Sequence, residues 1–250
     1  FGKAILDDKP NDTENKESVR VAYVQPNVST DWRDRNNEKY YWQKVNLLLE
    51  DNIEQVEKAD LLVFPEVSIP LSFNHYALDN SYLSAWSNKV NVLYAGIELT
   101  DQQLMANAGY FNRVEYIQQA QLNASYQKQK LLPFAEYLPF EEQLPWLRKV
   151  FPHTPRYQFG KNEPVMVINS QSKQINIVPL VCYESVFTNL VRQGVSANGK
   201  ILVNMVNDAW FSDNAGKRVH LALATFRSVE FNIPLLRVTN DGISGLIDAK

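Results

Sequence analysis

The chain has 250 residues, of which 45% are hydrophobic, so it can bury one large core or at most two small ones. A formal net charge of −3 and a sequence without a stripe of Lys and Arg argue against a dedicated nucleic-acid binder. A single cysteine excludes an intramolecular disulfide and a cysteine-rich zinc site, and the three histidines lack metal-ligand spacing. We therefore expect neither a metal nor a cofactor, and no apolar run reaches the roughly 18 residues that span a bilayer.

A polar and charged segment at the start of the chain, residues 1–18, has no sustained hydrophobic period and is interpreted as a linker. The rest, residues 19–250, alternates between short apolar runs and helical stripes, which is typical of one α/β domain whose sheets are covered by helices. In chain order, the pattern predicts a strand at 19–25, a helix at 38–58, a strand at 60–64, a helix at 80–89, strands at 90–99, 110–117, 124–127, 165–168 and 174–181, a helix at 185–195, a strand at 200–206, a helix at 219–231, and strands at 235–239 and 244–247.

Three polar side chains stand where predicted strands end, the place at which side chains of an α/β domain leave the packed interior. Glu66 follows LLVFP, Lys128 lies in SYQKQKLLPF, and Cys182 ends INIVPLVC. Each has an ordinary alternative: a helix cap, a surface lysine with Lys130 as its rival, and an inert core cysteine. Together they can form a nucleophilic site. The carboxylate would take the thiol proton, and the ammonium would lower the pKa of the thiol and stabilise an oxyanion.

The order of FPE, a lysine and CYE resembles the nitrilase (carbon–nitrogen hydrolase) superfamily. Longer phrases resemble one of its branches, the apolipoprotein N-acyltransferases of Gram-negative bacteria. The phrases are VAYVQPNV, PEVSIP, KQKLLPFAEYLP, VCYES, NDAWF and RSVEFNIPLLRVTNDGISGLID, and they extend from about residue 19 to residue 250. The resemblance implies a nitrilase-like α-β-β-α four-layer sandwich. Since that family continues beyond the SGLID strand, it also implies either an excised domain or a sandwich that lacks its last strands.

Position by position, the resemblance implies that Glu66 is the general base, Lys128 the oxyanion lysine and Cys182 the nucleophile. Lys128 matches better than Lys130 because the family's lysine stands five positions before the Pro-Phe pair. The remaining matched positions are two supporting glutamates, which would hold the lysine and the first glutamate in register, and two residues around the acyl site: Glu136 and Glu184, then Trp32 and Tyr183.

The implied activity is transfer of a fatty acyl chain from a phospholipid, through a cysteine thioester, to the N-terminal amine of diacylglyceryl-cysteine in apolipoproteins. The implied partners are a phospholipid, a lipoprotein N-terminus and a membrane surface. The implied location is the periplasmic face of the bacterial inner membrane, as a domain of a membrane-anchored parent. The alternative is a soluble amidase or nitrilase with the same three residues, although Glu184-Ser185 follows CY where such amidases tend to carry Asp and a basic residue. A non-catalytic binding sandwich is a third reading, which the complete residue set disfavours.

Two stretches, 71–77 and 140–159, can cover such a site. The second mixes apolar residues with basic ones, a pattern that suits a loop dipping into lipid headgroups. The alternative is a short amphipathic helix packed on the core. The two interpretations predict opposite exposure for the apolar residues of the second stretch, which are Trp146, Leu147, Val150 and Phe151.

Overall fold

A computed structural model describes residues 18–28, 36–66, 82–99, 109–170, 173–211 and 214–249. Its centre consists of two five-stranded sheets. Most of the expected linker, Trp32 and the stretch 71–77 lie outside the described residues. Within them, every expected strand is present and ends within a few residues of its expected bounds.

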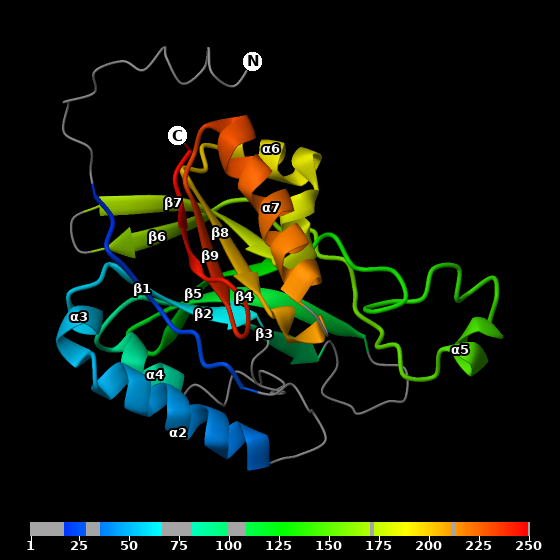
Figure 1. Cartoon of the computed structure of the whole chain (residues 1–250), viewed down its shortest axis with the longest axis horizontal. Coiled ribbons are helices and arrows are strands. Elements are labelled where there is room, and N and C mark those ends of the chain that lie inside the picture. Colours follow the sequence, from blue (N-terminus) through cyan, green and yellow to red (C-terminus); the bar gives the residue numbers. More distant parts are fainter. Residues whose placement is uncertain are drawn as a thin grey trace.

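The first sheet has the strand order β1-β2-β3-β4-β5. Three of its strands are parallel: β1 (Val21–Tyr23), β2 (Leu61–Glu66) and β3 (Val92–Leu99). An antiparallel hairpin completes it, β4 (Tyr110–Gln118) and β5 (Gln121–Gln127). One face of this sheet is covered by the helices that connect its parallel strands, α2 (Asn36–Glu50), α3 (Ile53–Glu57) and α4 (Tyr82–Ser87) (Figure 1).

The second sheet also has three parallel strands and two antiparallel ones, in the order β10-β9-β8-β7-β6. Its parallel strands are β7 (Lys173–Val181), β8 (Ile201–Val206) and β9 (Leu235–Thr239). Antiparallel strands form both edges, β6 (Met166–Ser170) and β10 (Gly245–Ile247). Two helices, α6 (Thr188–Ser196) and α7 (Asn214–Phe231), cover its outer face (Figure 1).

Alternation along the strands explains the layers. In β2, Val63 faces a core between the two sheets, whereas Leu62 faces the core beneath α2 and α4. In β8, Val203 joins the same central core, whereas Leu202 packs against α6 and α7. Strands buried on both faces read as continuous apolar runs, which is why these strands were visible in the sequence. Three cores thus separate four layers, and the expected α-β-β-α sandwich is confirmed.

Helix bounds were predicted less well than strands. The single helix expected at 38–58 is two helices, because the chain turns at Asp51 and Asn52 and the Asn52 side chain donates to the Leu48 carbonyl. The helix expected at 185–195 begins as a 3₁₀ turn, η2 (Cys182–Val186), and Phe187 is extended before α6 starts. No helix in the described ranges is long and apolar enough to cross a membrane.

Candidate active site

Glu66, Lys128 and Cys182 come from different strands. Glu66 is the last residue of β2, Lys128 follows β5, and Cys182 follows β7 of the other sheet. The Lys128 Nζ lies 3.5 Å from Glu66 Oε1. The Cys182 thiol lies within the electrostatic reach of both Glu66 and Lys128. The fold therefore brings together three side chains that are far apart in the sequence.

Lys128 is the most tightly held member of this group. Its side chain is 2% exposed, and its Nζ lies 2.6 Å from Glu136 Oε1. Burial alone would lower the pKa of Lys128, but the carboxylates of Glu66 and Glu136 outweigh burial and hold that pKa well above its ordinary value. Lys128 is therefore a permanent ammonium at this position. Lys130, its rival in the sequence, is exposed.

Cys182 occupies a strained position at the end of β7. Its φ is 53°, in the left-handed region that non-glycine residues rarely adopt. Burial and the neighbouring Glu66 carboxylate raise the pKa of the thiol well above its ordinary value, although Lys128 lowers it. Lys128 thus lowers the pKa of the thiol as expected, but desolvation and the Glu66 carboxylate outweigh its effect. The Cys182 thiol is therefore protonated at rest.

The two supporting glutamates act on different parts of the site. Glu136 binds the ammonium of Lys128 and also accepts from the Leu132 amide at 2.7 Å, as expected for a residue that holds the lysine. Glu184 does not hold a side chain of the group. Instead it accepts from the backbone amides of Gln129 at 2.6 Å, Lys130 at 3.0 Å and Val181 at 2.9 Å.

These contacts of Glu184 tie the loop after Lys128 to the strand before Cys182. Burial raises the pKa of Glu184 to about 7, against the opposing effect of the backbone amides that donate to it. The Tyr126 hydroxyl donates a further bond at 2.9 Å. Glu184 is therefore a connection between the two sheets at the level of the site, rather than a partner of Glu66.

Asn112 holds Glu66 and was not among the site residues predicted from the sequence. Its Nδ2 donates to Glu66 Oε1 at 2.9 Å, and its backbone carbonyl accepts from the Lys128 amide at 2.7 Å. Asn112 is buried near the start of β4. An amide inside a buried strand needs a polar partner, so the asparagine within YFNRVEYI was a usable signal.

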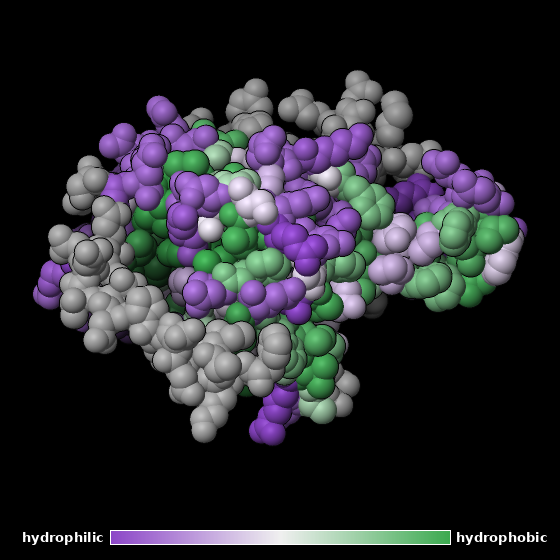
Figure 2. Space-filling view, turned by 90° about the horizontal axis from the view of Figure 1, so that it is seen from above, coloured by the Kyte–Doolittle hydropathy of each residue, from purple (hydrophilic) through white to green (hydrophobic). Residues whose placement is uncertain are grey.

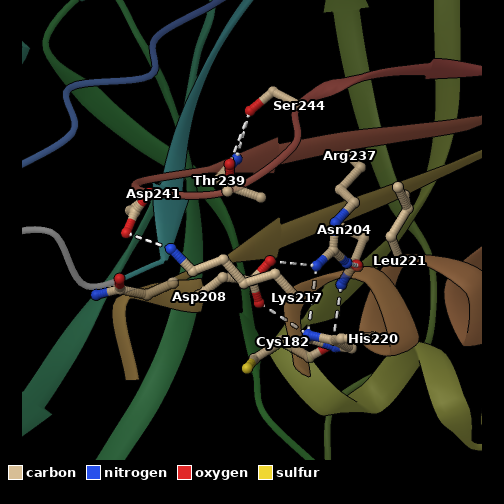
Figure 3. Close-up of polar contacts among 12 residues, drawn as sticks. Cys182, Asn204, Asp208, Lys217, His220, Leu221, Arg237, Thr239, Asp241 and Ser244 are labelled. Atoms are coloured by element: carbon tan, nitrogen blue, oxygen red, sulfur yellow. Dashed lines mark hydrogen bonds and ion pairs between the residues drawn. The ribbon is translucent and has the colours of Figure 1, made fainter. Parts of the chain in front are cut away.

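A second group missed from the sequence lies behind Cys182. Asn204, Asp208, His220 and Arg237 are buried and bonded to one another and to the Cys182 carbonyl (Figure 3). The sulfur of Cys182 points away from them (Figure 3). Here too the signal was a polar residue within a buried strand, since Asn204 interrupts ILVNMV and Arg237 interrupts LLRVT.

Comparison with known proteins decides the family. The model of the carbon–nitrogen hydrolase family matches residues 20–249. The chain belongs to the carbon–nitrogen hydrolase family. It is similar to the apolipoprotein N-acyltransferase of Pseudomonas syringae pv. tomato, with 30% identity over 92% of this chain and 44% of that protein. It is also similar to the enzyme of that name from Rhizobium meliloti, with 32% identity over 93% and 44%. The chain thus spans less than half the length of these relatives.

Solved structures of other proteins share the fold of this chain. An amidase from Nesterenkonia sp. AN1 matches with a TM-score of 0.61 and 17% identity, over 92% of this chain and 82% of that one. A nitrilase-superfamily protein from Saccharomyces cerevisiae matches with a TM-score of 0.62 and 15% identity, over the same shares. These likenesses agree with the two mixed sheets and their outer helices.

The remaining expectations from the sequence concern Tyr183, Trp32 and metal binding. Tyr183 is half-buried, and its ring packs edge-on against Phe187 at 5.5 Å. Trp32 lies outside the described residues, so the structure places only one of the two expected acyl-site residues. Among the residues that are described, no group of three His, Cys, Asp or Glu side chains could hold a metal ion.

The segment 140–159, which we call the arm, projects from the sandwich and carries the short helix α5 (Leu147–Val150) (Figure 1). No residue of α5 is buried, so the alternative of a helix packed on the core is wrong. Trp146 and Val150 are 56% and 58% exposed. Figure 2 shows hydrophobic and hydrophilic surface side by side on this protrusion.

The arm has its own polar anchor. Glu141 accepts from Arg148 at 2.7 Å and from Arg156 at 2.8 Å. These hydrogen bonds and the two positive charges lower the pKa of Glu141 to about 2. The anchor holds the two ends of the arm together while its aromatic side chains face outward.

Proposed function

We propose that this chain carries the catalytic domain of an apolipoprotein N-acyltransferase, with Cys182 as nucleophile, Glu66 as general base and Lys128 as oxyanion donor. The observation that supports the proposal most directly is the convergence of these three side chains. The Lys128 ammonium lies 3.5 Å from the Glu66 carboxylate, and both groups act electrostatically on the Cys182 thiol. Similarity to relatives of that name supports this reading over other reactions of the family.

In the first half-reaction, the Cys182 thiol gives its proton to Glu66 as the sulfur attacks the ester carbonyl of a phospholipid. A raised thiol pKa fits this order, because the proton then leaves during attack and no free thiolate is needed. Lys128 stabilises the oxyanion of the tetrahedral intermediate. When the ester C–O bond breaks, Glu66 returns the proton to the leaving oxygen. A lysophospholipid departs, and the acyl group stays on the sulfur as a thioester.

In the second half-reaction, the α-amine of a diacylglyceryl-cysteine attacks the thioester carbonyl. Glu66 takes a proton from the amine nitrogen, the C–S bond breaks, and the proton passes to the sulfur. The lipoprotein gains an amide and the enzyme regains its thiol. Glu136 keeps the Lys128 ammonium in place through both steps by its 2.6 Å contact.

The arm supports a location at a lipid surface. Similarity to the apolipoprotein N-acyltransferases leads us to propose that this surface is the periplasmic face of the bacterial inner membrane. The exposed apolar side chains of the arm stand beside the basic Arg148 and Lys149, and this combination suits the headgroup region. Such contact would bring the phospholipid to the site. It would also help to keep water from the thioester until the amine arrives.

Acyl transfer through Cys182 can be followed by intact mass. With phospholipid vesicles alone, the protein should gain one acyl group on Cys182 and release lysophospholipid. Addition of a diacylglyceryl-cysteine peptide should remove the adduct and acylate the peptide. Cys182→Ala should lower peptide acylation by at least about 10³-fold, because covalent catalysis is lost.

Two results would contradict the proposal. N-acylation of the peptide by Cys182→Ala would exclude the thioester. Hydrolysis of small amides by wild-type protein, without any acyl transfer from phospholipid, would instead favour the soluble amidase with the same three residues.

A further inference from the structure

The backbone carbonyl of Cys182 receives an unusual number of side-chain donors. Asn204 Nδ2 donates to it at 3.1 Å, His220 Nε2 lies at 3.3 Å, and Ser185 Oγ donates at 3.2 Å. Because a carbonyl oxygen only accepts, Nε2 of His220 carries a proton and donates. The left-handed φ of Cys182 costs conformational energy and persists only where the surroundings determine it fully. These donors are the surroundings that do so.

The donors belong to a closed ring of contacts that begins and ends at this carbonyl. Asn204 Oδ1 accepts from Arg237 at 2.7 Å. Arg237 pairs with Asp208 Oδ2 at 2.8 Å, and Asp208 Oδ1 lies 2.9 Å from His220 Nδ1. His220 then returns to Cys182 through its other ring nitrogen (Figure 3).

Each member of the ring comes from a different element. Asn204 lies on β8, Asp208 on η3 (Asp208–Trp210), His220 on α7 and Arg237 on β9. Arg237 is 0% exposed and His220 5% exposed. Buried charges are tolerated only when they are paired, so the ring has one low-energy arrangement and transmits the positions of four elements to one carbonyl.

We propose that His220 is a positioning residue for the nucleophile: it fixes the backbone of Cys182 and thereby aims the sulfur at Glu66. The carbonyl faces the ring and the sulfur points the other way, so movement of the carbonyl swings the sulfur (Figure 3). The inference rests on the proposed role of Cys182 as nucleophile. The alternative is that His220 only satisfies Asp208 and contributes stability.

The two alternatives predict opposite changes in thiol reactivity. If His220 positions the sulfur, its loss should slow attack by Cys182, since a small displacement separates the thiol from its base. If His220 is only structural, its loss should loosen the turn and expose the thiol, so that labelling is unchanged or faster. Cys182 is the one cysteine of the chain, and the mass gain with iodoacetamide therefore reports on it alone.

The test compares alkylation rates near neutral pH in the full chain, well below each variant's melting temperature. His220→Leu removes the contacts of the imidazole with Asp208 and with the Cys182 carbonyl, with little change in side-chain volume. It should slow alkylation by at least about tenfold. His220→Gln keeps a donor at the Nε2 position and should remain within about threefold of wild type. Ser228→Ala is the matched control. Ser228 is also buried on α7, and its hydroxyl donates to the backbone carbonyls of Ile233 and Ile247. The variant should therefore have a lower melting temperature and an unchanged alkylation rate.

Unchanged or faster alkylation of His220→Leu overturns the inference while leaving the proposed function standing. If that variant does not fold, Ser185→Ala carries the test, because it removes one donor without touching an ion pair. Its alkylation should be about threefold slower, and a wild-type rate would overturn the inference. Failure of folded wild-type protein to alkylate at all would overturn the nucleophile itself, and the positioning role with it.

Discussion

The candidate catalytic centre and the arm differ in where they place charged and apolar side chains. In the centre, Lys128 is 2% exposed and its charge is balanced by two carboxylates at 2.6 and 3.5 Å. In the arm, Trp146 is 56% exposed, while the carboxylate of Glu141 remains partly accessible between two arginines. The centre thus hides charge inside the sandwich, and the arm presents apolar surface outside it.

This contrast separates chemistry from surface recognition. A buried charge that loses its partner is strongly penalised, so substitutions in the centre should abolish activity and disturb the fold. An exposed aromatic contributes little to the core, so substitutions in the arm should change binding and leave the fold intact. Substitutions in both regions therefore test whether the centre carries the chemistry and the arm carries the surface binding.

The largest effect is expected for Lys128→Arg. The substitution keeps the positive charge, but a planar guanidinium does not fit a fully buried site shaped around an ammonium that contacts Glu66 and Glu136. Acyl transfer should fall by about 10²- to 10³-fold, the usual consequence of losing an oxyanion donor. The exposed Lys130→Arg is the matched control and should be silent. Near-wild-type turnover by Lys128→Arg would show that charge alone suffices in the centre.

A smaller loss is expected for Asn112→Ala, which removes the amide that donates to Glu66 at 2.9 Å. A hydrogen bond to a charged group is worth about 1.5–3 kcal/mol, so kcat should fall by about 10- to 100-fold. KM should change little, because Asn112 holds the base. Asn123→Ala, an exposed position on β5, serves as control. A change in KM alone would place Asn112 in substrate binding instead.

Lys128 was predicted from the sequence and Asn112 was not, and the difference between them has a physical reason. The buried strands could be recognised because their residues are apolar on both faces, and Glu66, Lys128 and Cys182 because they stand at strand ends. Asn112 and Arg237 were missed because their partners Glu66 and Asn204 lie on other strands, and a local sequence pattern does not show which strands lie side by side. Helix ends were displaced where side chains such as Asn52 compete with the backbone. The raised thiol pKa also depends on burial, which no motif encodes.

In the arm, replacement of Trp146 and Phe151 by Ser should weaken binding to phospholipid vesicles with little change in melting temperature. Each aromatic would contribute on the order of 1.5–3 kcal/mol when it enters lipid. Phe226→Ser is a matched control, since Phe226 is 61% exposed on α7 but lies on the outer face of the sandwich. Equal loss of vesicle binding in the control, or a steep fall in the double variant's melting temperature, would contradict the lipid-facing role.

The smallest effect concerns the anchor of the arm and its dependence on pH. Arg148 and Arg156 lower the pKa of Glu141 to about 2, below its ordinary value of 4.5. A carboxyl group with a lowered pKa stabilises the folded arm above its ordinary pKa, and this contribution is lost as pH falls through about 2. Pepsin should therefore cleave within 140–159 faster as the pH falls toward about 2. This increase should be larger than any increase in cleavage of the sandwich.

Glu141→Gln should remove that pH dependence, because the arm would then lack its ionic anchor at every pH. Its arm should already be cut readily by trypsin at neutral pH, where the wild-type arm resists. Glu142→Gln changes the neighbouring exposed carboxylate and should leave both behaviours as they are. If the two variants are cleaved alike, the anchor does not order the arm. The arm's aromatic side chains would then have to be arranged by the lipid surface, and the contrast with the rigid centre would be sharper still.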